Sequence, residues 1–312
     1  MKSKDCPIIV LVGPTAVGKT ACALELVQRF DCEIVSMDSM QVYRYMDIGT
    51  AKPSVEEQAQ VPHHLIDIVD PDEQYDVARF VYDAEQAIEE IAARGKAALL
   101  TGGTGLYLKA FFEGLFSALP TDPEVREKLQ QRLAEEGREV LYAELARIDS
   151  LAAARIHQND TQRLLRGLEI FQISGETWTD LLKRQQQEKS SQIRFNRVFQ
   201  VGLTCDREEL YQRIAQRSGL MLEQGLLAEV ESLCNMGYSL DLPSMQSIGY
   251  RHVGNFLSGL WNQSEMLEYL IRDTRRYAKR QMTWFKKNKS LQWVDRQNYA
   301  LLIEQINKAL SL

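Results

Sequence analysis

The feature that most constrains the fold is a glycine-rich segment between an apolar run and a helical pattern. Gly13-Pro-Thr-Ala-Val-Gly-Lys-Thr20 matches G-x-x-x-x-G-K-[ST] at every fixed position, directly after residues 8–12. Its glycines let backbone N–H groups surround an anionic oxygen, and the following helix adds its positive N-terminus. Lys19 adds a positive charge, and Thr20 can ligate Mg²⁺. A di- or triphosphate is therefore predicted to bind to Gly13, Pro14, Thr15, Ala16, Val17, Gly18, Lys19 and Thr20.

Apolar runs and helical patterns alternate over the first hundred residues. The apolar runs, at residues 8–12, 33–37, 64–68 and 97–101, suit strands buried on both faces. Residues 21–30 and 80–94 have the spacing of helices. This alternation predicts an α/β domain with a parallel sheet flanked by helices, as in P-loop NTPases.

The alternation ends near residue 120, where helix signals take over. Asp122 can cap a helix, Pro123 suits its first position, and an apolar stripe follows at Val125, Leu129 and Leu133. Helical patterns continue at 140–148, 151–156 and 161–173, the polar residues 183–197 resemble a connection, and 198–203 resemble a strand. We predict a core of residues 1–117 and 196–312, interrupted by an all-helical insertion domain at 118–195.

Charge is distributed unevenly along the chain. With 312 residues, 45% of them apolar, the chain is expected to be globular, and its net charge of −6 argues against generic nucleic-acid binding. Residues 272–289, however, hold eight cations and one anion, with Tyr277, Trp284 and Phe285 interleaved. The cations at 272, 275, 276, 279 and 280 share one face if the segment is helical. A solvated helix face is the usual explanation of such a run, but its contrast with the acidic remainder favours a polyanionic partner.

The compartment is predicted from what the sequence lacks. No apolar run approaches the ~20 residues needed to cross a bilayer, and the N-terminus enters its apolar run without a small-residue cleavage site. We therefore expect a cytoplasmic protein with no membrane partner. The cysteines are odd in number and include no C-x-x-C pair, so we expect reduced thiols at Cys6, Cys22, Cys32, Cys205 and Cys234.

Polar residues follow two of the predicted strands. Ligands of open α/β sheets bind at the carboxyl ends of strands, which makes Asp38 a candidate general base or outer Mg²⁺ partner and brings the hydroxyl of Thr104 to the same edge. Alternatively, Asp38 caps a helix that starts at Ser39, and residues 102–105 form a turn selected for its dihedral angles. Asp67, after two apolar residues, resembles the Mg²⁺-holding Asp of NTPases, which keeps a kinase as an alternative.

Further cations lie outside the basic run. Gln162-Arg-Leu-Leu-Arg166 places two arginines at adjacent positions of a predicted helix. Arg126 lies in a first helical turn, where the dipole disfavours a cation, so an external anion would explain it. Tyr250 and Arg251 could stack on a base or bind phosphate, although Tyr250 could equally belong to the core.

Taken together, these segments resemble the bacterial tRNA dimethylallyltransferases, also called tRNA isopentenyltransferases. The resemblance runs through nearly the whole chain, at residues 13–20, 38–43, 46–53, 63–67, 102–107, 249–251 and 275–285. It implies transfer of a dimethylallyl group from dimethylallyl diphosphate to the exocyclic N6 amine of the adenosine immediately 3′ of the anticodon, with release of diphosphate. No Cys/His cluster matches the zinc finger that eukaryotic relatives often carry.

The resemblance also implies roles for individual residues. Asp38 matches the family's general base, and we count Thr104 and Lys19 with it as catalytic residues. Arg213 and Arg217, one turn apart, are candidate diphosphate clamps. Mg²⁺ on Thr20 is the expected cofactor. We expect a monomer that binds the anticodon stem-loop of tRNA and flips out the target base. Candidate tRNA contacts are Asp38, Ser39, Met40, Gln41, Thr104, Arg126, Gln162, Arg163, Leu164, Leu165, Arg166, Gln246, Tyr250, Arg251, Arg276, Lys279 and Arg280.

Overall fold

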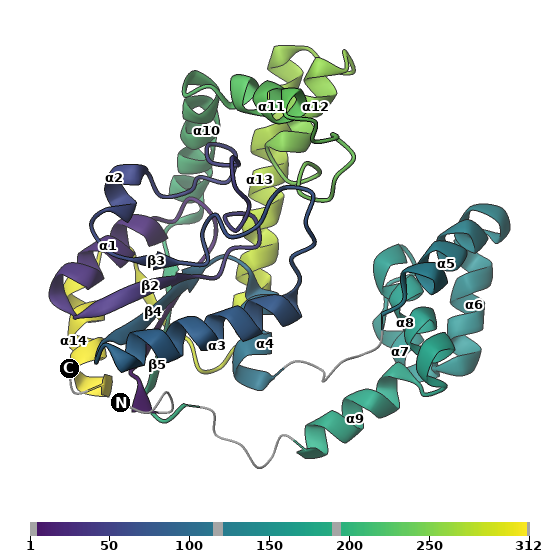
Figure 1. Cartoon of the computed structure of the whole chain (residues 1–312), viewed down its shortest axis with the longest axis horizontal. Helices are drawn as coiled ribbons and strands as arrows, with labels where there is room; N and C mark the ends of the chain where they lie inside the picture. Colours follow the sequence, from purple (N-terminus) through teal and green to yellow (C-terminus); the bar gives the residue numbers. More distant parts are fainter. Residues whose placement is uncertain (1–4, 115–120, 189–194, 311–312) are drawn as a thin grey trace. The chain divides into compact units, whose positions relative to one another are not determined.

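The computed structural model describes residues 5–114, 121–188 and 195–310, drawn in Figure 1. Contacts divide the chain into two compact units. The core unit comprises Met1–Lys109 and Arg194–Leu312, and the insertion unit comprises Ala110–Ile193. The insertion unit therefore begins before the predicted residue 118, inside helix α4 (Gly105–Glu113).

The core unit is built on one parallel sheet. Its strands, within the described ranges, are β1 (Ile8–Val12), β2 (Cys32–Ser36), β3 (His63–His64), β4 (Ala97–Gly102), β5 (Val198–Thr204) and β6 (Gln292–Asp295). They lie in the order β3-β2-β4-β1-β5-β6, and every neighbouring pair is parallel. The predicted α/β class is confirmed. The predicted strand at 64–68 is wrong beyond His64, because Leu65 and Asp67 adopt φ values of 63° and 55°, which end the extended conformation.

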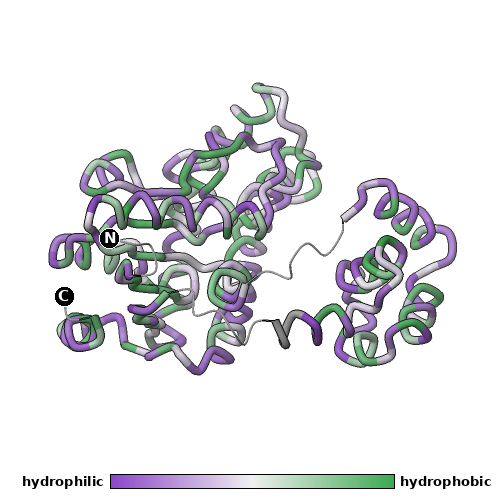
Figure 2. Tube along the Cα trace, turned by 60° about the horizontal axis from the view of Figure 1, so that its bottom comes forward, coloured by the Kyte–Doolittle hydropathy of each residue, from purple (hydrophilic) through white to green (hydrophobic). Residues whose placement is uncertain are grey.

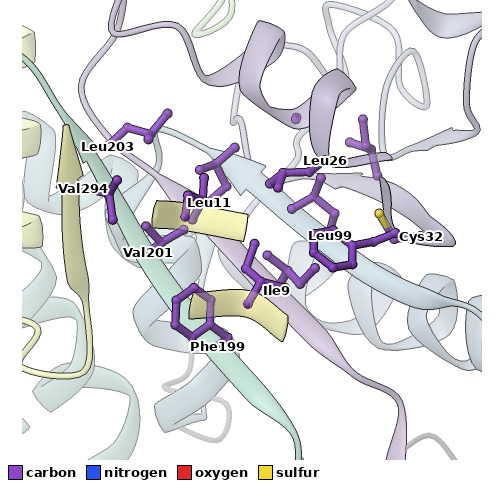
Figure 3. Close-up of a cluster of buried hydrophobic side chains, with 14 of the residues drawn as sticks. Ile9, Leu11, Leu26, Cys32, Leu99, Phe199, Val201, Leu203 and Val294 are labelled. Atoms are coloured by element: carbon purple, nitrogen blue, oxygen red, sulfur yellow. The ribbon is translucent and has the colours of Figure 1, made fainter. Parts of the chain in front are cut away.

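Both faces of the sheet are buried, as its continuous apolar strands require. Figure 3 shows one side, where Ile9 and Leu11 pack with Leu26 of α1 and with Phe199 of β5. Residues of β1 that point the opposite way, such as Val10, are also fully buried. The core helices are α1 (Lys19–Arg29), α2 (Val55–Gln58), α3 (Val77–Ala93), α10 (Arg207–Glu223), α11 (Leu226–Asn235), α12 (Tyr250–Leu257), α13 (Gln263–Phe285) and α14 (Tyr299–Leu310).

The insertion unit has a small core of its own. Its further helices are α5 (Pro123–Glu136), α6 (Arg138–Ile148), α7 (Ser150–Arg155), α8 (Thr161–Ser174) and α9 (Trp178–Glu188). Asp122 caps α5 as predicted, since its carboxylate accepts from the N–H of Glu124 at 2.8 Å. Hydrophobic and hydrophilic residues alternate along these helices in Figure 2, and the buried ones include Leu129, Leu141 and Leu168. The prediction of a connection from residue 183 is wrong as far as Glu188, where α9 ends.

Membrane-spanning helices and the state of the cysteines can be assessed for the described residues. No helix there is long and apolar enough to span a membrane. The cysteines there are all free, and Cys6 and Cys32 are buried.

The glycines after β4 allow the chain to pack closely against itself. A Cβ at Gly102 would lie 2.2 Å from the carbonyl oxygen of Met37, at the end of neighbouring β2. A Cβ at Gly103 would lie 2.3 Å from Nε2 of Gln281, and one at Gly105 would lie 2.2 Å from Cδ1 of Trp284. None of the three has a positive φ. The explanation by dihedral angles is therefore wrong. The missing side chains instead allow these glycines to pack closely against other parts of the chain.

We predict that Gly102→Ala lowers the free energy of unfolding by about 1–3 kcal/mol, because a methyl group there must displace backbone. Gly219→Ala in α10 is the matched control, since a Cβ there meets no atom within 4 Å, and it should raise that free energy by about 0.5–1 kcal/mol. Urea denaturation measures both values. Equal stability of Gly102→Ala and the wild type would contradict the close-packing argument.

Candidate active site

The phosphate loop leaves β1 and ends at the first residue of α1. Gly18 precedes α1 with φ of 106°, and no side chain caps the helix. The first N–H groups of α1 are thus left without a capping side chain, which is the arrangement that binds oxyanions. The loop that follows β1 therefore has free backbone donors that can bind a phosphate group.

Lys19 folds back over this loop. Its Nζ donates to the carbonyl oxygens of Gly13, at 3.1 Å, and Pro14, at 3.0 Å. Desolvation lowers the pKa of Lys19 to about 8, although the nearby carboxylate of Asp38 acts in the opposite direction. A bound anion would restore the preference for the charged ammonium group.

Two arginines of α10 reach the same loop. Nε of Arg213 donates to the carbonyl oxygen of Ala16 at 2.7 Å, and Nη2 of Arg217 donates to the hydroxyl of Thr15 at 2.5 Å. Desolvation lowers the pKa of Arg217, with partial compensation by Asp38. Both side chains therefore contact the phosphate loop, and their binding of a diphosphate stays a prediction.

Two cavities of the core unit meet at Asp38. The first, about 350 Å³, is lined by phosphate-loop residues including Lys19 and Thr20, together with Arg213. The second, about 330 Å³, is lined by residues that include Tyr277 and Arg280 of α13. The two cavities share Thr15, Asp38, Thr50 and Arg217. A group bound in one cavity can thus approach a group bound in the other beside the Asp38 carboxylate.

Asp38 is held by a turn and by Thr104. Its Oδ1 accepts from the N–H of Met40 at 2.9 Å, and Oγ1 of Thr104 accepts from the N–H of Ser39 at 3.1 Å. Residues 39–42 form a bend and a turn, so the alternative that Asp38 caps a helix is wrong. Thr104 lies at the predicted edge but lines neither cavity. Its hydroxyl fixes the backbone next to the carboxylate.

Asp67 does not reach the phosphate loop. Its Oδ1 lies 2.5 Å from Nζ of Lys52, and it lines neither cavity. The resemblance to a Mg²⁺-holding Asp of NTPases is therefore wrong here, and the kinase alternative loses its main support. Gln41 lines the first cavity, where its Nε2 donates to the carbonyl oxygens of Thr50 and Ala51 at 3.4 and 3.2 Å.

The predicted basic face lies on α13. Arg272, Arg276, Lys279 and Arg280 are exposed, which confirms a shared helical face. Arg275 is half-buried, with its guanidinium carbon 5.0 Å from the ring centroid of Tyr211. Asp273 accepts from Arg251, Arg272 and Arg276 at 3.3, 3.1 and 3.3 Å. Of the three aromatic residues interleaved with these cations, Phe285 is buried, Tyr277 is half-buried and Trp284 is exposed.

Tyr250 belongs to the core. It is 0% exposed, and its hydroxyl donates to Oε1 of Glu229 at 2.5 Å, so the prediction that it contacts tRNA is wrong. Its neighbour Arg251 keeps 40% of its side chain exposed. Gln246 is exposed and lines the second cavity.

The cations of the insertion unit surround an acid that the sequence did not single out. Glu169 is 2% exposed, and its carboxylate lies 3.2 Å from Arg126 and 2.7 Å from Arg166. Glu169 therefore explains Arg126 without an external anion. Arg163 pairs with Asp160, and Gln162 is exposed. Leu164 is buried in the core of the unit, so its predicted contact with tRNA is wrong, whereas neighbouring Leu165 is half-buried.

Gln281 is a site residue that sequence reasoning missed. Its Oε1 accepts from the N–H of Thr15 at 2.8 Å, and its Nε2 donates to the carbonyl oxygen of Gly103 at 2.9 Å. One buried carboxamide on α13 thus joins the phosphate loop to the turn after β4. The sequence signal that could have identified Gln281 is an uncharged polar residue among the apolar positions of α13.

The residues present fit Mg²⁺ bound mainly through a substrate. Among the described residues, no group of three or more His, Cys, Asp or Glu side chains could hold a metal ion. Thr20 and Asp38 line the first cavity together. Mg²⁺ commonly keeps several waters and binds through one or two protein oxygens plus phosphate oxygens, so the hydroxyl of Thr20 can serve as its one direct protein ligand.

Comparison with known proteins points to one family. Residues 41–288 match the family model of IPP transferases. The chain is 52% identical over 304 residues to the tRNA dimethylallyltransferase of Desulfotalea psychrophila, covering 97% of this chain and 96% of that protein. It is 46% identical over 296 residues to the tRNA dimethylallyltransferase of Bacillus velezensis, with coverage of 95% and 92%.

Solved structures agree with the sequence comparison. The full-length tRNA isopentenylpyrophosphate transferase of Bacillus halodurans is 38% identical with a TM-score of 0.71, covering 98% of this chain and 97% of that chain. A eukaryotic dimethylallyltransferase acting on tRNA is 28% identical with a TM-score of 0.75, covering 98% of this chain and 77% of that chain.

We predict that the affinity for an alkyl diphosphate falls above about pH 8, because Lys19 then loses its proton. Binding favours the ammonium form, so the association constant should fall toward tenfold per pH unit at about pH 8–10. Calorimetric titration with methyl diphosphate measures it. Lys19→Arg is the control, since a guanidinium stays charged and its profile should be flat. A flat profile for the wild type between pH 7 and 9.5 would contradict the role of Lys19.

Proposed function

Because the chain belongs to the IPP transferase family and is an enzyme that transfers a dimethylallyl group to tRNA, we propose that the two cavities receive its two substrates. The first cavity takes dimethylallyl diphosphate, with its phosphates on the loop 13–20. The second takes the adenine of the nucleotide immediately 3′ of the anticodon. The observation that carries this proposal is the junction of the cavities at Asp38.

In the proposed reaction, a C–N bond forms and a C–O bond breaks. The N6 amine of the adenine attacks the allylic C1 carbon, and the bonding electrons leave with the diphosphate. Lys19, Arg213, Arg217 and the N-terminus of α1 lie where they can stabilise the negative charge that develops on the leaving group. When bound at Thr20, Mg²⁺ would neutralise part of this charge.

Asp38 is the proposed general base. The exocyclic amine of adenine is a poor nucleophile, so removal of its proton during attack helps the reaction. Oδ1 of Asp38 accepts from the N–H of Met40, and within the described part of the chain Oδ2 accepts no hydrogen bond. Oδ2 is thus the oxygen that would take the proton. Thr104 acts on the reaction by holding Ser39 next to this carboxylate.

The RNA is proposed to bind through exposed cations. The face of α13 carries Arg276, Lys279 and Arg280, and Arg280 also lines the second cavity. The cations can hold phosphates of the anticodon stem-loop, while the target base leaves its stack to enter the cavity. In the insertion unit, Gln162 and Arg163 present exposed polar groups, and the side chain of Arg126 is 46% exposed.

The proposal extends to location and assembly. We infer a cytoplasmic location from the tRNA substrate. We further propose that the enzyme is active as a monomer.

Two other functions make different predictions in one assay. A small-metabolite kinase would release ADP without RNA, and a non-catalytic RNA-binding protein would bind tRNA without forming a product. Incubation with radiolabelled dimethylallyl diphosphate and unmodified tRNA, with ATP as the control nucleotide, distinguishes these functions. Label on the RNA, dependent on both substrates, supports the proposal, whereas ADP release without RNA would overturn it.

We predict that Asp38→Asn lowers the rate of transfer by about 10²–10⁴-fold, the usual contribution of a general base. Asparagine keeps an oxygen that can accept from Met40, so the turn and the binding of both substrates should be retained. Single-turnover transfer and separate binding measurements test this. Asp31→Asn is the matched control, since Asp31 is exposed, lies just before β2 and lines neither cavity. A near wild-type rate for Asp38→Asn would exclude Asp38 as the base.

We predict that the double variant Arg276→Glu with Lys279→Glu weakens tRNA binding at least tenfold and reduces its dependence on salt. Each phosphate contact that is lost lowers the salt slope by about one. Both residues are exposed, whereas Arg275 is half-buried and Arg280 lines a cavity. Filter binding at several salt concentrations measures affinity and slope. Arg29→Glu with Lys308→Glu is the control of equal charge change on exposed residues of α1 and α14. Equal effects of the two double variants would show that only net charge matters.

A further inference from the structure

The loop of residues 46–53 forms a wall shared by the two cavities. Thr50 lines both of them, Ala51 and Pro53 line the first, and Gly49 lines the second. None of these residues belongs to a helix or a strand, so contacts with other segments must fix their position. Any change in this wall would alter the junction beside Asp38.

A single carboxylate of α11 holds the start of this wall. Oε2 of Glu229 accepts from the N–H groups of Asp47, at 3.0 Å, and Ile48, at 2.8 Å. Its Oε1 accepts from the N–H of Gly49 at 3.1 Å. Three consecutive backbone donors thus converge on one side chain that lies 180 or more residues away in the sequence. Hydrogen bonds to an ionised acceptor are about twice as strong as neutral ones.

Tyr250 completes this clamp from α12. Its hydroxyl donates to Oε1 of Glu229 at 2.5 Å, and its ring lies against Gly49, where a Cβ would come within 2.3 Å of Cε2. Burial, and next the charge of Glu229, raise the pKa of Tyr250, so the phenol remains a donor at any physiological pH. The ring and the hydroxyl together locate both the loop and the carboxylate.

The other end of the wall is held by different groups. Nζ of Lys52 donates to the carbonyl oxygen of Tyr43 at 2.9 Å and lies 2.5 Å from each of Asp47 and Asp67. Nε2 of Gln41 donates to the carbonyl oxygens of Thr50 and Ala51. The loss of Glu229 would therefore release the backbone N–H groups of residues 47–49 without unfolding the whole loop.

We propose that Glu229, supported by Tyr250, is a positioning residue that fixes residues 47–50 and so keeps the two cavities in register at Asp38. Glu229 lines neither cavity and acts only through the loop. The inference rests on the proposed function insofar as the cavities are taken as the two substrate sites. A carboxylate is required, because the amide nitrogen of glutamine would face backbone N–H groups that need an acceptor.

The test compares Glu229→Gln and Glu229→Ala with Glu231→Gln, which changes an exposed glutamate of the same helix. Hydrogen exchange of the amides of residues 47–49 should accelerate at least tenfold in the Glu229 variants and stay unchanged in the control. Single-turnover transfer should fall at least tenfold, while methyl diphosphate affinity stays within about threefold because the phosphate loop is untouched. Tyr250→Phe should show a smaller change of the same kind.

The outcomes separate the clamp from the proposed function. Unchanged amide exchange in the Glu229 variants would overturn the clamp, and so would faster exchange with a normal transfer rate. An equal loss of diphosphate binding and transfer would indicate general destabilisation and would also overturn it. If the wild-type enzyme transferred no dimethylallyl group, the proposed function would fail, whereas the exchange measurement would still decide whether Glu229 holds the loop. Tyr250→Phe keeps the clamp testable if Glu229→Ala does not fold.

Discussion

Positive charge gathered at the end of β1 is the constraint on which the rest of the site depends. Lys19, Arg213 and Arg217 converge on the phosphate loop, where the charge of Asp38 acts to raise the pKa of Lys19 and Arg217 against desolvation. Partly desolvated cations in such a place are unfavourable without an anion. In this structure the three cations donate hydrogen bonds to carbonyl and hydroxyl oxygens of the loop itself. The proposed diphosphate would replace these uncharged partners with full negative charges, so the surroundings of the loop would favour its binding.

Local patterns predicted the parts of the site that lie within one segment. The phosphate loop, the acid after β2 and the basic face of α13 each depend on residues close in sequence, whose spacing reports their geometry. Gln281 and Glu229 could not be found in this way. The partners of Gln281 lie 178 and 266 residues away, and those of Glu229 about 180. A polar side chain inside a helical pattern does not reveal which backbone groups it contacts. The same limit explains the glycines of residues 102–105, whose lack of a side chain serves contacts with β2 and α13.

Charge was the least reliable guide, because a cation's partner is not visible in the sequence. Arg126 was expected to need an external anion, but Glu169, buried in the insertion unit, pairs with it. Removing a charged carboxylate from water is unfavourable by several kcal/mol, so a buried acid needs cations around it. Glu169 thus holds two arginines beside it. Asp273 has the same effect on α13, where it holds several guanidinium groups in place without cancelling them.

The separation of charges between surface and cavity has a consequence for the two substrates. Exposed cations act through water, where salt screens their attraction beyond about 8–10 Å. Lys19 and Arg217 are half-buried beside a cavity, so their proposed interaction with a diphosphate would be screened less. Rising salt should therefore release the RNA well before the diphosphate. The net charge of −6 therefore says little about the binding of either substrate. Electrostatic attraction in salt depends on the cations near each proposed site and not on the sum over the whole chain.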